Sequence, residues 1–380
     1  MARKTDTHQD DSWESQRRNR RPGRQGDQRV DLRQNREEGH QPCSGADRKA
    51  VRLDPRLAWF ADVKAVLSPM SGVTDRAFRD VCRPFGMDLG FCEFTSASGL
   101  YHTSEATWRL IDTDAEDGRV GIQIFGADPH HMGEAACLLR TRRHDVLDIN
   151  FGCPAKKVVK KCGGSALLAD LPLMAEIVRR VIAGSAEVPV SAKIRSGWDE
   201  ASINQIEVGL MLQELGCVWV TLHGRTRAQK FTGRANWDHI ADLVAALDIP
   251  VIGNGDVVDG ASYQAMVRHT GCHAVMVGRG AIGNPWIFQE MISAGAGRRV
   301  TRPGLDEMID VMIDHIGREV ARKGERTGCF QVRKHIARCF RGWPGASSLR
   351  RRIFSHETSA GMIAVLQQAR VEYQAGQGAA

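Results

Sequence analysis

The sequence lacks several patterns that would assign it to common classes of protein. It contains no run of 18 or more apolar residues, so no membrane-spanning helix is predicted. No apolar segment typical of a secretory signal peptide follows the N-terminus. None of the ten cysteines forms a C-x-x-C pair, which removes the common zinc-binding and thioredoxin-type motifs. We therefore expect a cytoplasmic protein with reduced thiols, no membrane contact and no metal.

What the chain does have is an uneven distribution of charge. Its 52 Lys and Arg residues exceed its 45 Asp and Glu residues by seven. Residues 318–370 hold 12 basic and three acidic residues, whereas residues 51–317 hold 28 basic and 32 acidic residues. Segregated positive charge favours a polyanionic partner, because neutralised phosphates release counterions. A solvated basic helical face would give the same pattern, so charge alone leaves both interpretations open.

Length and composition predict a disordered extension followed by two domains. At roughly 150 residues per domain, a chain of 380 residues suggests two folded units. Residues 1–50 are polar and non-periodic, so they cannot bury enough apolar surface to offset the entropy of ordering. Gly-rich Ser293–Gly297 and Pro303 mark a linker. The expected boundaries are 1–50 for the extension, 51–300 and 301–372 for the two domains, and 373–380 for a flexible tail.

Apolar runs alternate with amphipathic segments through the first domain, which indicates parallel strands joined by right-handed crossovers. Eight such units match the size of a (β/α)8 TIM barrel, typically about 250 residues. A doubly wound sheet is the structural rival, but no G-x-G-x-x-G follows the first strand. After Ile287 the pattern predicts helices only, so the expected α/β fold is a barrel followed by a small C-terminal all-helical domain. The expected strands are Val63–Met70, Leu89–Thr95, Val120–Phe125, Val146–Phe151, Val188–Ile194, Val218–His223, Pro250–Asn254 and Ala274–Gly278, and the expected C-terminal helices are Leu305–Lys323, Gln331–Arg341, Leu349–His356 and Thr358–Ala369.

Polar side chains and glycines follow the expected strands at one rim. In a (β/α)8 barrel the active site lies at the carboxyl ends of the strands. Each signal is weak singly, because a lysine can lie on the surface and a cysteine is more often a buried apolar filler. Their co-location at one rim favours a functional site. The strand-end residues include Pro69, Met70, Gln123, Asn150, Cys153, Lys193, Arg195, His223, Arg225, Asn254, Gly255, Asp256, Gly278, Arg279 and Gly280.

These residues separate into two subsites. Glycines follow the last two strands, where backbone N–H groups can approach a phosphate closely, and an arginine there adds a charge-assisted contact. Polar residues on strands three, five and six can hydrogen-bond a planar heterocycle. That combination suits flavin mononucleotide (FMN), because a cation near the ring stabilises the anionic reduced form. The phosphate subsite comprises Gly255, Gly278, Gly280 and Arg279, and the heterocycle subsite comprises Gln123, Lys193 and His223.

Cys153 lies in the loop after the fourth strand, close to Asn150 and between Gly152 and Pro154. A strand-end thiol that faces a flavin can act as a nucleophile or as a proton donor. A basic loop follows it, which we expect either to lower the pKa of the thiol or to bind phosphates of a large substrate. The basic residues of this loop are Lys156, Lys157, Lys160 and Lys161.

In family order over about residues 60–290, these motifs resemble those of the tRNA-dihydrouridine synthases. Arg333-Lys334-His335 and Pro344 in the helical domain are similar to the bacterial B-type branch. The matching segments are Leu67-Ser68-Pro69-Met70-Ser71-Gly72-Val73-Thr74-Asp75, Asp148-Ile149-Asn150-Phe151-Gly152-Cys153-Pro154, Gly163-Gly164-Ser165-Ala166-Leu167-Leu168, Lys193-Ile194-Arg195-Ser196-Gly197-Trp198, His223-Gly224-Arg225-Thr226, Asn254-Gly255-Asp256, Gly278-Arg279-Gly280 and Gly283-Asn284-Pro285-Trp286-Ile287-Phe288.

The resemblance implies an FMN barrel with a helical domain that binds tRNA, and NADPH or NADH as the reductant. It implies that hydride passes from flavin N5 to uracil C6 of a flipped uridine. Cys153 would then donate the proton to C5. The implied flavin contacts are Pro69, Met70, Gln123, Lys193, His223, Asn254, Gly255, Asp256, Gly278 and Arg279, and the implied substrate contacts are Asn150, Arg195, Arg225, Lys156, Lys157, Arg333, Lys334 and Arg338.

Two other functions compete with this interpretation. An FMN barrel that acts on a free base, such as a dihydroorotate or dihydropyrimidine dehydrogenase, would not need the basic helical segment. An RNA-binding protein with an inactive barrel would not need the set Cys153, Lys193, His223 and Arg279. A dihydrouridine synthase that acts on rRNA instead of tRNA is a further alternative. Because the RNA would supply the large interface, we expect a monomer.

Overall fold

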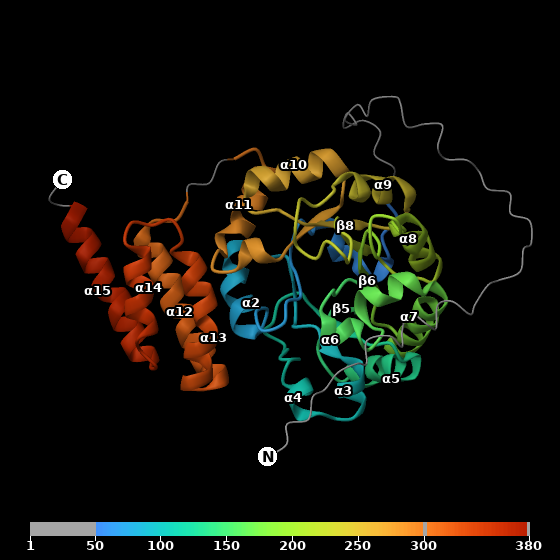
Figure 1. Cartoon of the computed structure of the whole chain (residues 1–380), viewed down its shortest axis with the longest axis horizontal. Helices are drawn as coiled ribbons and strands as arrows, with labels where there is room; N and C mark the ends of the chain where they lie inside the picture. The colour runs from blue at the N-terminus through green and yellow to red at the C-terminus, as the bar shows by residue number, and fades with distance from the viewer. Residues whose placement is uncertain (1–50, 299–301, 378–380) are drawn as a thin grey trace, which may run out of the picture. The chain divides into compact units, whose positions relative to one another are not determined.

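A computed structural model describes residues 51–298 and 302–377, and its strands form a closed parallel sheet. The sheet runs in the order β2-β1-β9-β8-β7-β6-β5-β4-β3, and β2 also pairs with β4, which closes the barrel. Helices surround it (Figure 1), which confirms the predicted (β/α)8 barrel. The strands are β1 (Ala65–Leu67), β2 (Leu89–Phe91), β3 (Thr95–Ser96), β4 (Val120–Phe125), β5 (Val146–Asn150), β6 (Val190–Arg195), β7 (Val220–His223), β8 (Val251–Asn254) and β9 (Ala274–Val277).

The second strand of the eight-stranded barrel is broken into two short pieces, β2 and β3, so nine strands are described. β2 pairs with the start of β4, and β3 pairs with its end, where Thr95 lies opposite Ile124. The predicted continuous strand Leu89–Thr95 is therefore interrupted at residues 92–94. Glu93 in this gap accepts a hydrogen bond from the backbone N–H of Gly72, which ties the broken second strand to the loop after β1.

Aspartates begin several of the barrel helices. Asp75, Asp128, Asp170 and Asp259 each accept a hydrogen bond from a backbone N–H in the first turn of α2, α5, α7 and α10 respectively. Such caps satisfy donors that the first helical turn leaves unpaired. The helices of this part are η1 (Pro55–Asp62), α2 (Arg76–Cys82), η2 (Arg83–Phe85), α3 (Ala97–Tyr101), α4 (Glu105–Trp108), α5 (Pro129–Leu139), α6 (Lys156–Val159), η3 (Gly164–Ala169), α7 (Leu171–Ser185), α8 (Gln205–Glu214), α9 (Asp238–Ala246), α10 (Gly260–Thr270), η4 (Arg279–Ala281) and α11 (Trp286–Gly295).

The C-terminal part is all-helical and has an apolar core of its own, which includes Met312, Ile336 and Leu366. It comprises α12 (Leu305–Lys323), α13 (Glu325–Cys339), α14 (Ala346–Phe354) and α15 (Ser359–Gln377). α12 has its predicted bounds. α13 begins six residues before the predicted Gln331, because Gly324, with φ +78°, reverses the chain in a single residue.

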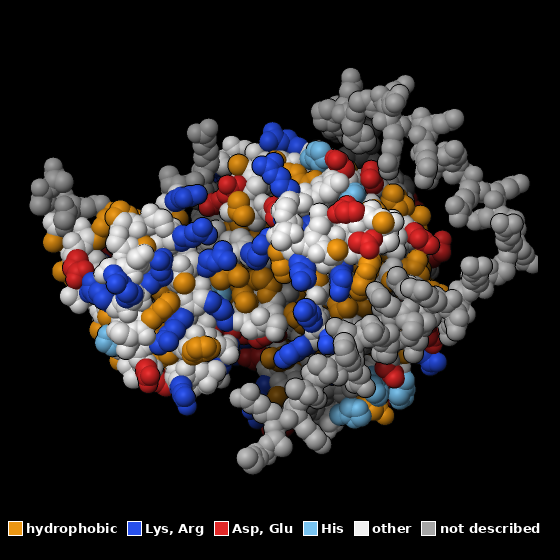
Figure 2. Space-filling model, in the orientation of Figure 1, with side chains coloured by type: hydrophobic (Ala, Val, Ile, Leu, Met, Phe, Trp, Pro, Cys, Tyr) orange, Lys and Arg blue, Asp and Glu red, His pale blue; other side chains and the backbone are white. Residues whose placement is uncertain are grey.

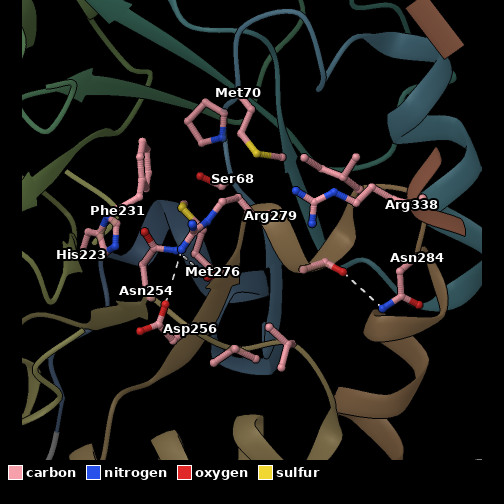
Figure 3. A pocket seen from close by; sticks show the side chains of 18 of the residues that line it. Ser68, Met70, His223, Phe231, Asn254, Asp256, Met276, Arg279, Asn284 and Arg338 are labelled. Carbon is pink, nitrogen blue, oxygen red and sulfur yellow. Dashed lines mark hydrogen bonds and ion pairs between the residues drawn. The ribbon is translucent and has the colours of Figure 1, made fainter. Parts of the chain in front are cut away.

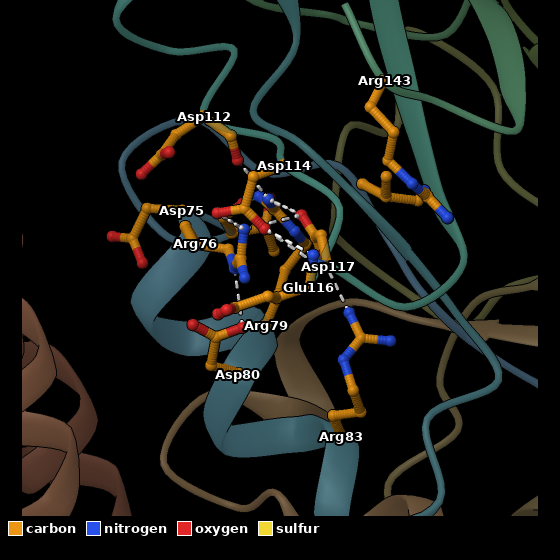
Figure 4. Close-up of polar contacts among 12 residues, drawn as sticks. Asp75, Arg76, Arg79, Asp80, Arg83, Asp112, Asp114, Glu116, Asp117 and Arg143 are labelled. Carbon is orange, nitrogen blue, oxygen red and sulfur yellow. Dashed lines mark hydrogen bonds and ion pairs between the residues drawn. The ribbon is translucent and has the colours of Figure 1, made fainter.

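Ion pairs tie α2 to the loop between α4 and β4 (Figure 4), and a further pair joins this loop to the helical part. Arg79 of α2 and Asp117 are both fully buried and lie 2.5 Å apart. Arg322 of α12 contacts Asp112 in the same loop at 2.8 Å. Breaking a buried ion pair typically costs about 3–5 kcal/mol, because the remaining charge is left without a partner. The network therefore fixes α2 and the loop between α4 and β4, and α12 contacts that loop from the side of the helical part.

The remaining sequence expectations concern the ends and the linker. α11 extends to Gly295, so the first residues of the expected linker are helical, and α15 extends to Gln377, past the predicted end at Ala369. Residues 1–50, expected as a disordered extension, lie outside the described residues. Within the described residues, no helix combines the length and the hydropathy that spanning a bilayer requires.

Candidate active site

A cavity of about 1020 Å³ opens at the carboxyl ends of the barrel strands and extends to α13. Figure 3 shows Met70, His223, Phe231 and Arg279 in this cavity, and Arg338 at its other side. Most of the predicted site residues line it: Pro69, Met70, Gln123, Asn150, Cys153, Lys156, Lys193, Arg195, His223, Asn254, Gly255, Asp256, Gly278, Arg279 and Arg338. Lys157, Arg225, Arg333 and Lys334 do not line it.

Asn150 holds the loop that carries Cys153. Its Oδ1 accepts hydrogen bonds from the backbone N–H groups of Gly152 (3.0 Å) and Cys153 (2.9 Å). Its Nδ2 donates to Gln123 Oε1 at 2.8 Å. Both polar atoms of the Asn150 amide are thus engaged in three hydrogen bonds, so Asn150 fixes the backbone of the loop that carries Cys153.

A chain of buried hydrogen bonds supports Asn150 from below. Gln123 Nε2 donates to Asp148 Oδ2 at 2.7 Å, and Ser191 Oγ donates to Asp148 Oδ1 at 2.5 Å. Because Asp148 accepts from Nε2, the Gln123 oxygen is left to accept from Asn150. Burial raises the pKa of Asp148 to about 6 against the opposing effect of these bonds. Asp148 was part of a matching motif, but sequence reasoning gave it no role.

The Cys153 thiol is partly buried, and burial raises its pKa. A backbone hydrogen bond from Ala155 and the charges of Arg195 and Lys193 act in the opposite direction and are outweighed. Of the two roles expected for the basic loop, lowering this pKa does not prevail, because desolvation of the thiolate dominates; binding of substrate phosphates stays a prediction. A thiol that keeps its proton at neutral pH suits a proton donor rather than a nucleophile.

Lys193 projects from β6 into the same cavity and donates from Nζ to Asn254 Oδ1 at 2.9 Å. Asn254 in turn donates to the backbone oxygen of Met276 at 2.7 Å, which fixes its amide orientation. Burial, with the neighbouring positive charge of Arg195 next in effect, lowers the pKa of Lys193 to about 7. This cation is thus held at a point where an added negative charge would favour its protonated form.

His223 is neutral in this arrangement. Burial and then the surrounding cations, led by Lys193, lower its pKa well below the ordinary value. Arg225 Nη1 lies 3.2 Å from His223 Nε2, and an arginine can only donate. His223 Nε2 therefore accepts, which leaves the proton of the neutral ring on Nδ1.

The two predicted arginine contacts serve largely as supports. Arg225 is buried and pairs with Asp256 through Nη2, at 2.8 and 2.7 Å. Arg195 donates to the backbone oxygens of Gly152 (2.7 Å), Thr226 (3.0 Å) and Lys230 (2.8 Å). Arg225 thus lies behind the cavity wall, whereas Arg195 ties the Cys153 loop to the loop after β7.

The opposite end of the cavity is built from glycines and Arg279. A Cβ atom on Gly278 would project toward Met70 Sδ (3.5 Å) and Ser68 Cβ (3.7 Å), so the absence of a side chain keeps this space open. The Arg279 side chain is half exposed, and its guanidinium lies 3.5 Å from the Asp256 carboxylate. This end therefore offers a positive group beside an open backbone surface.

Phe231 is a cavity residue that sequence reasoning missed. Its ring is 51 % exposed and lies beneath two guanidinium groups, those of Arg195 (5.4 Å) and Arg279 (5.0 Å). It belongs to the irregular segment after β7, where periodicity gives no signal. An aromatic residue eight positions after His223 was the one feature that could have indicated it.

The remaining predicted cations lie at the edges of the site. Lys156 and Lys157 are exposed on the short helix α6. Arg333 donates to the backbone oxygen of His356 at 3.0 Å, and Lys334 donates to the backbone oxygen of Gly72. Lys334 therefore joins α13 to the loop after β1. Arg338 is exposed at the cavity.

Fold and site together define a (β/α)8-barrel enzyme with an all-helical C-terminal domain. A family model described as "Dihydrouridine synthase (Dus)" matches residues 66–374, and the chain belongs to this family of oxidoreductases. The chain is 38% identical over 273 residues to tRNA-dihydrouridine synthase B of Pasteurella multocida, and the aligned region covers 71% of this chain and 82% of that protein. It is 37% identical over 302 residues to tRNA-dihydrouridine synthase B of Pseudomonas aeruginosa (79% and 90%). A probable tRNA-dihydrouridine synthase of Mycobacterium tuberculosis is 36% identical over 298 residues (75% and 77%).

Proposed function

We propose that this protein reduces specific uridines of tRNA to 5,6-dihydrouridine, with FMN bound in the cavity and NADPH as the reductant. The observation that carries the proposal is the Cys153 thiol, which keeps its proton and is held at the cavity by Asn150. The names of the relatives, which are tRNA-dihydrouridine synthases, support the substrate.

The residues present fit FMN. The cavity volume suits a cofactor of this size with room for a base beside it. Arg279 and the open backbone at Gly278 would hold the phosphate, and Lys193 and Gln123 would face the polar edge of the ring. When bound, FMN supplies the hydride for uracil C6 and is reduced again by NADPH.

The protein's own residues would then handle the proton. Cys153 would donate its proton to uracil C5, because its raised pKa keeps the thiol protonated at neutral pH. Asn150 would keep the thiol in place, and the chain through Gln123 to Asp148 would keep Asn150 from rotating. Negative charge beside Lys193 would favour its protonated form, because burial has lowered its pKa to about 7.

The position of the helical domain at the cavity favours a large substrate over a free base. Arg338 and Arg341 of this domain line the cavity together with the strand-end residues, so an RNA seated there would contact both parts of the chain. Figure 2 shows basic side chains over the C-terminal helices and around the hollow at the barrel end. An enzyme that acts on a free base would have no need of this surface.

The test supplies purified protein with FMN and NADPH and offers it unmodified tRNA transcripts. Nucleosides from the digested RNA are then analysed for dihydrouridine by mass spectrometry, with free uracil and an rRNA transcript as parallel substrates. We expect dihydrouridine in tRNA and no reduction of free uracil. A flavin-loaded protein that leaves all tRNA uridines unreduced would refute the proposal, and reduction of the free base alone would favour the dehydrogenase alternative.

A further inference from the structure

Phe330 on α13 is the most exposed large apolar side chain among the described residues, with 71 % of its surface accessible. The buried face of α13 is already filled by other residues, among them Cys329, Val332 and Ile336. Phe330 lies on the opposite face, so it has no apolar core to join. Single exposed apolar residues are common in proteins, and exposure alone would carry no function.

The surroundings of Phe330 set it apart from other exposed apolar residues. Residues 326–356, which include all but the first residue of α13 and the whole of α14, contain eight Lys and Arg residues and no Asp or Glu. Arg326 lies one turn before Phe330, and Arg333 lies one turn after it. The guanidinium of Arg333 lies over the ring of Phe354 at 5.5 Å, which places a second aromatic ring beside the same surface.

The same helix leads to the candidate active site. Arg338, two turns after Phe330, lines the cavity, and a helix rises about 1.5 Å per residue, which puts the two residues about 12 Å apart along α13. Figure 2 shows basic side chains over the C-terminal helices on the face that is hollowed at the barrel end. A chain of phosphates that reaches the cavity over α13 would pass Phe330.

We propose that Phe330 is a stacking platform for an unpaired base of the RNA substrate, next to the nucleotide that enters the cavity. Proteins recognise single-stranded RNA by stacking its bases on aromatic side chains within a basic surface. Arg326, Arg333 and Arg338 supply the charge that holds the backbone, and Phe330 supplies the ring. This inference rests on the proposed function only for the identity of the partner as RNA.

The test measures the affinity of the full-length protein for an unmodified tRNA transcript and for a fully paired RNA duplex of similar length. Removal of one base–aromatic stack weakens binding by about 5- to 150-fold. We expect Phe330→Ala to weaken tRNA binding within that range and to leave duplex binding unchanged. Phe330→Trp should retain the affinity, whereas Phe330→Leu, which keeps apolar surface without a ring, should not.

Two further variants separate stacking from charge and from general exposure. Val371→Ala on α15 changes a residue that is 65 % exposed, and it should bind tRNA like the wild type. Arg326→Ala should lower the dependence of the affinity on salt by about one phosphate contact, whereas Phe330→Ala should leave that slope unchanged.

Several outcomes would overturn the inference. These are wild-type affinity of Phe330→Ala for tRNA, an equal loss for the paired duplex, and a change in oligomeric state without a change in RNA affinity. The last would assign Phe330 to a contact between copies of the chain. Failure of the proposed function is distinguishable, because it would appear as tRNA binding that depends on Phe330 without any dihydrouridine formed by the wild type.

Discussion

Gly283, in the loop after β9, packs directly against the backbone of α13. It has φ +65°, and its N–H donates to His335 Nδ1 at 3.3 Å. A Cβ atom here would lie 2.8 Å from Cys339 N and 3.0 Å from Arg338 Cβ, and closer still to the backbone oxygen of His335. These atoms belong largely to the α13 backbone, so no side-chain rotation can relieve the clash.

Gly283→Ala should therefore push α13 away from the barrel, and Gly233→Ala is the matched control. Gly233 also has φ +65°, but no atom lies within 4 Å of the Cβ atom it would gain. Both variants pay the cost of a left-handed residue, about 1–2 kcal/mol. Only Gly283→Ala adds overpacking, which typically costs about 1–3 kcal/mol. The expected difference between the two variants in free energy of unfolding is thus about 1–3 kcal/mol.

Urea unfolding of both variants measures this difference, and tRNA binding measures its consequence at the site. Arg338 lies on α13 at the cavity, so a displaced α13 would move Arg338 as well. The Gly283→Ala variant should therefore bind tRNA more weakly than the wild type, whereas the Gly233→Ala variant should not. Equal unfolding free energies, within about 0.5 kcal/mol, would refute the close packing of α13 against the loop after β9.

Two further predictions follow from the buried polar groups. Asn150→Ala removes the acceptor for the N–H groups of Gly152 and Cys153, so single-turnover reduction of tRNA should slow by about 100-fold with flavin affinity nearly unchanged; an unchanged rate would show that Asn150 does not position the thiol. Burial, and next the charges of His315 and Lys334, lowers the pKa of His335 well below its usual range. His335 takes up a proton near pH 6.5 in the unfolded chain but only at a much lower pH in the folded chain. The free energy of unfolding is therefore at its full value above about pH 6.5 and falls as the pH decreases toward the folded-state pKa. Urea unfolding between about pH 7 and pH 5 should show this loss, and His335→Asn should reduce its slope; equal slopes would contradict the assignment.

The barrel could be predicted from the sequence because each of its units repeats the same signal. Short apolar runs such as Val120–Phe125 and Val146–Asn150 are flanked by amphipathic helices, and parallel pairing places their carboxyl ends at one rim. Residues such as Gln123 and Lys193 could therefore be assigned to one rim from the sequence alone. The break between β2 and β3 could not be predicted, since residues 92–94 carry no turn signal.

The partners of several site cations could not be predicted, because they are distant in sequence. Arg225 was expected at the substrate, but Asp256, 31 residues later, takes its guanidinium behind the cavity wall. Lys334 donates to the backbone oxygen of Gly72, 262 residues earlier, and its expected contact with RNA stays a prediction. A charge pattern in the sequence identifies the cations, but it does not reveal which of them form ion pairs or hydrogen bonds within the protein. The direction in which the Cys153 pKa shifts could not be read from the nearby charges either, because burial outweighs them.

Single-turnover reduction of unmodified tRNA by flavin-loaded, pre-reduced protein tests the assignment of Cys153 most directly. General acid catalysis contributes about 10²- to 10⁴-fold to a rate, so Cys153→Ala should form dihydrouridine slower than the wild type by that factor while still binding flavin and oxidising NADPH. Cys162→Ala is the control, because Cys162 is an exposed thiol nine residues further along the same loop. It should react at the wild-type rate. Wild-type rates for Cys153→Ala, or an equal loss for both variants, would contradict the role of Cys153 as the proton donor.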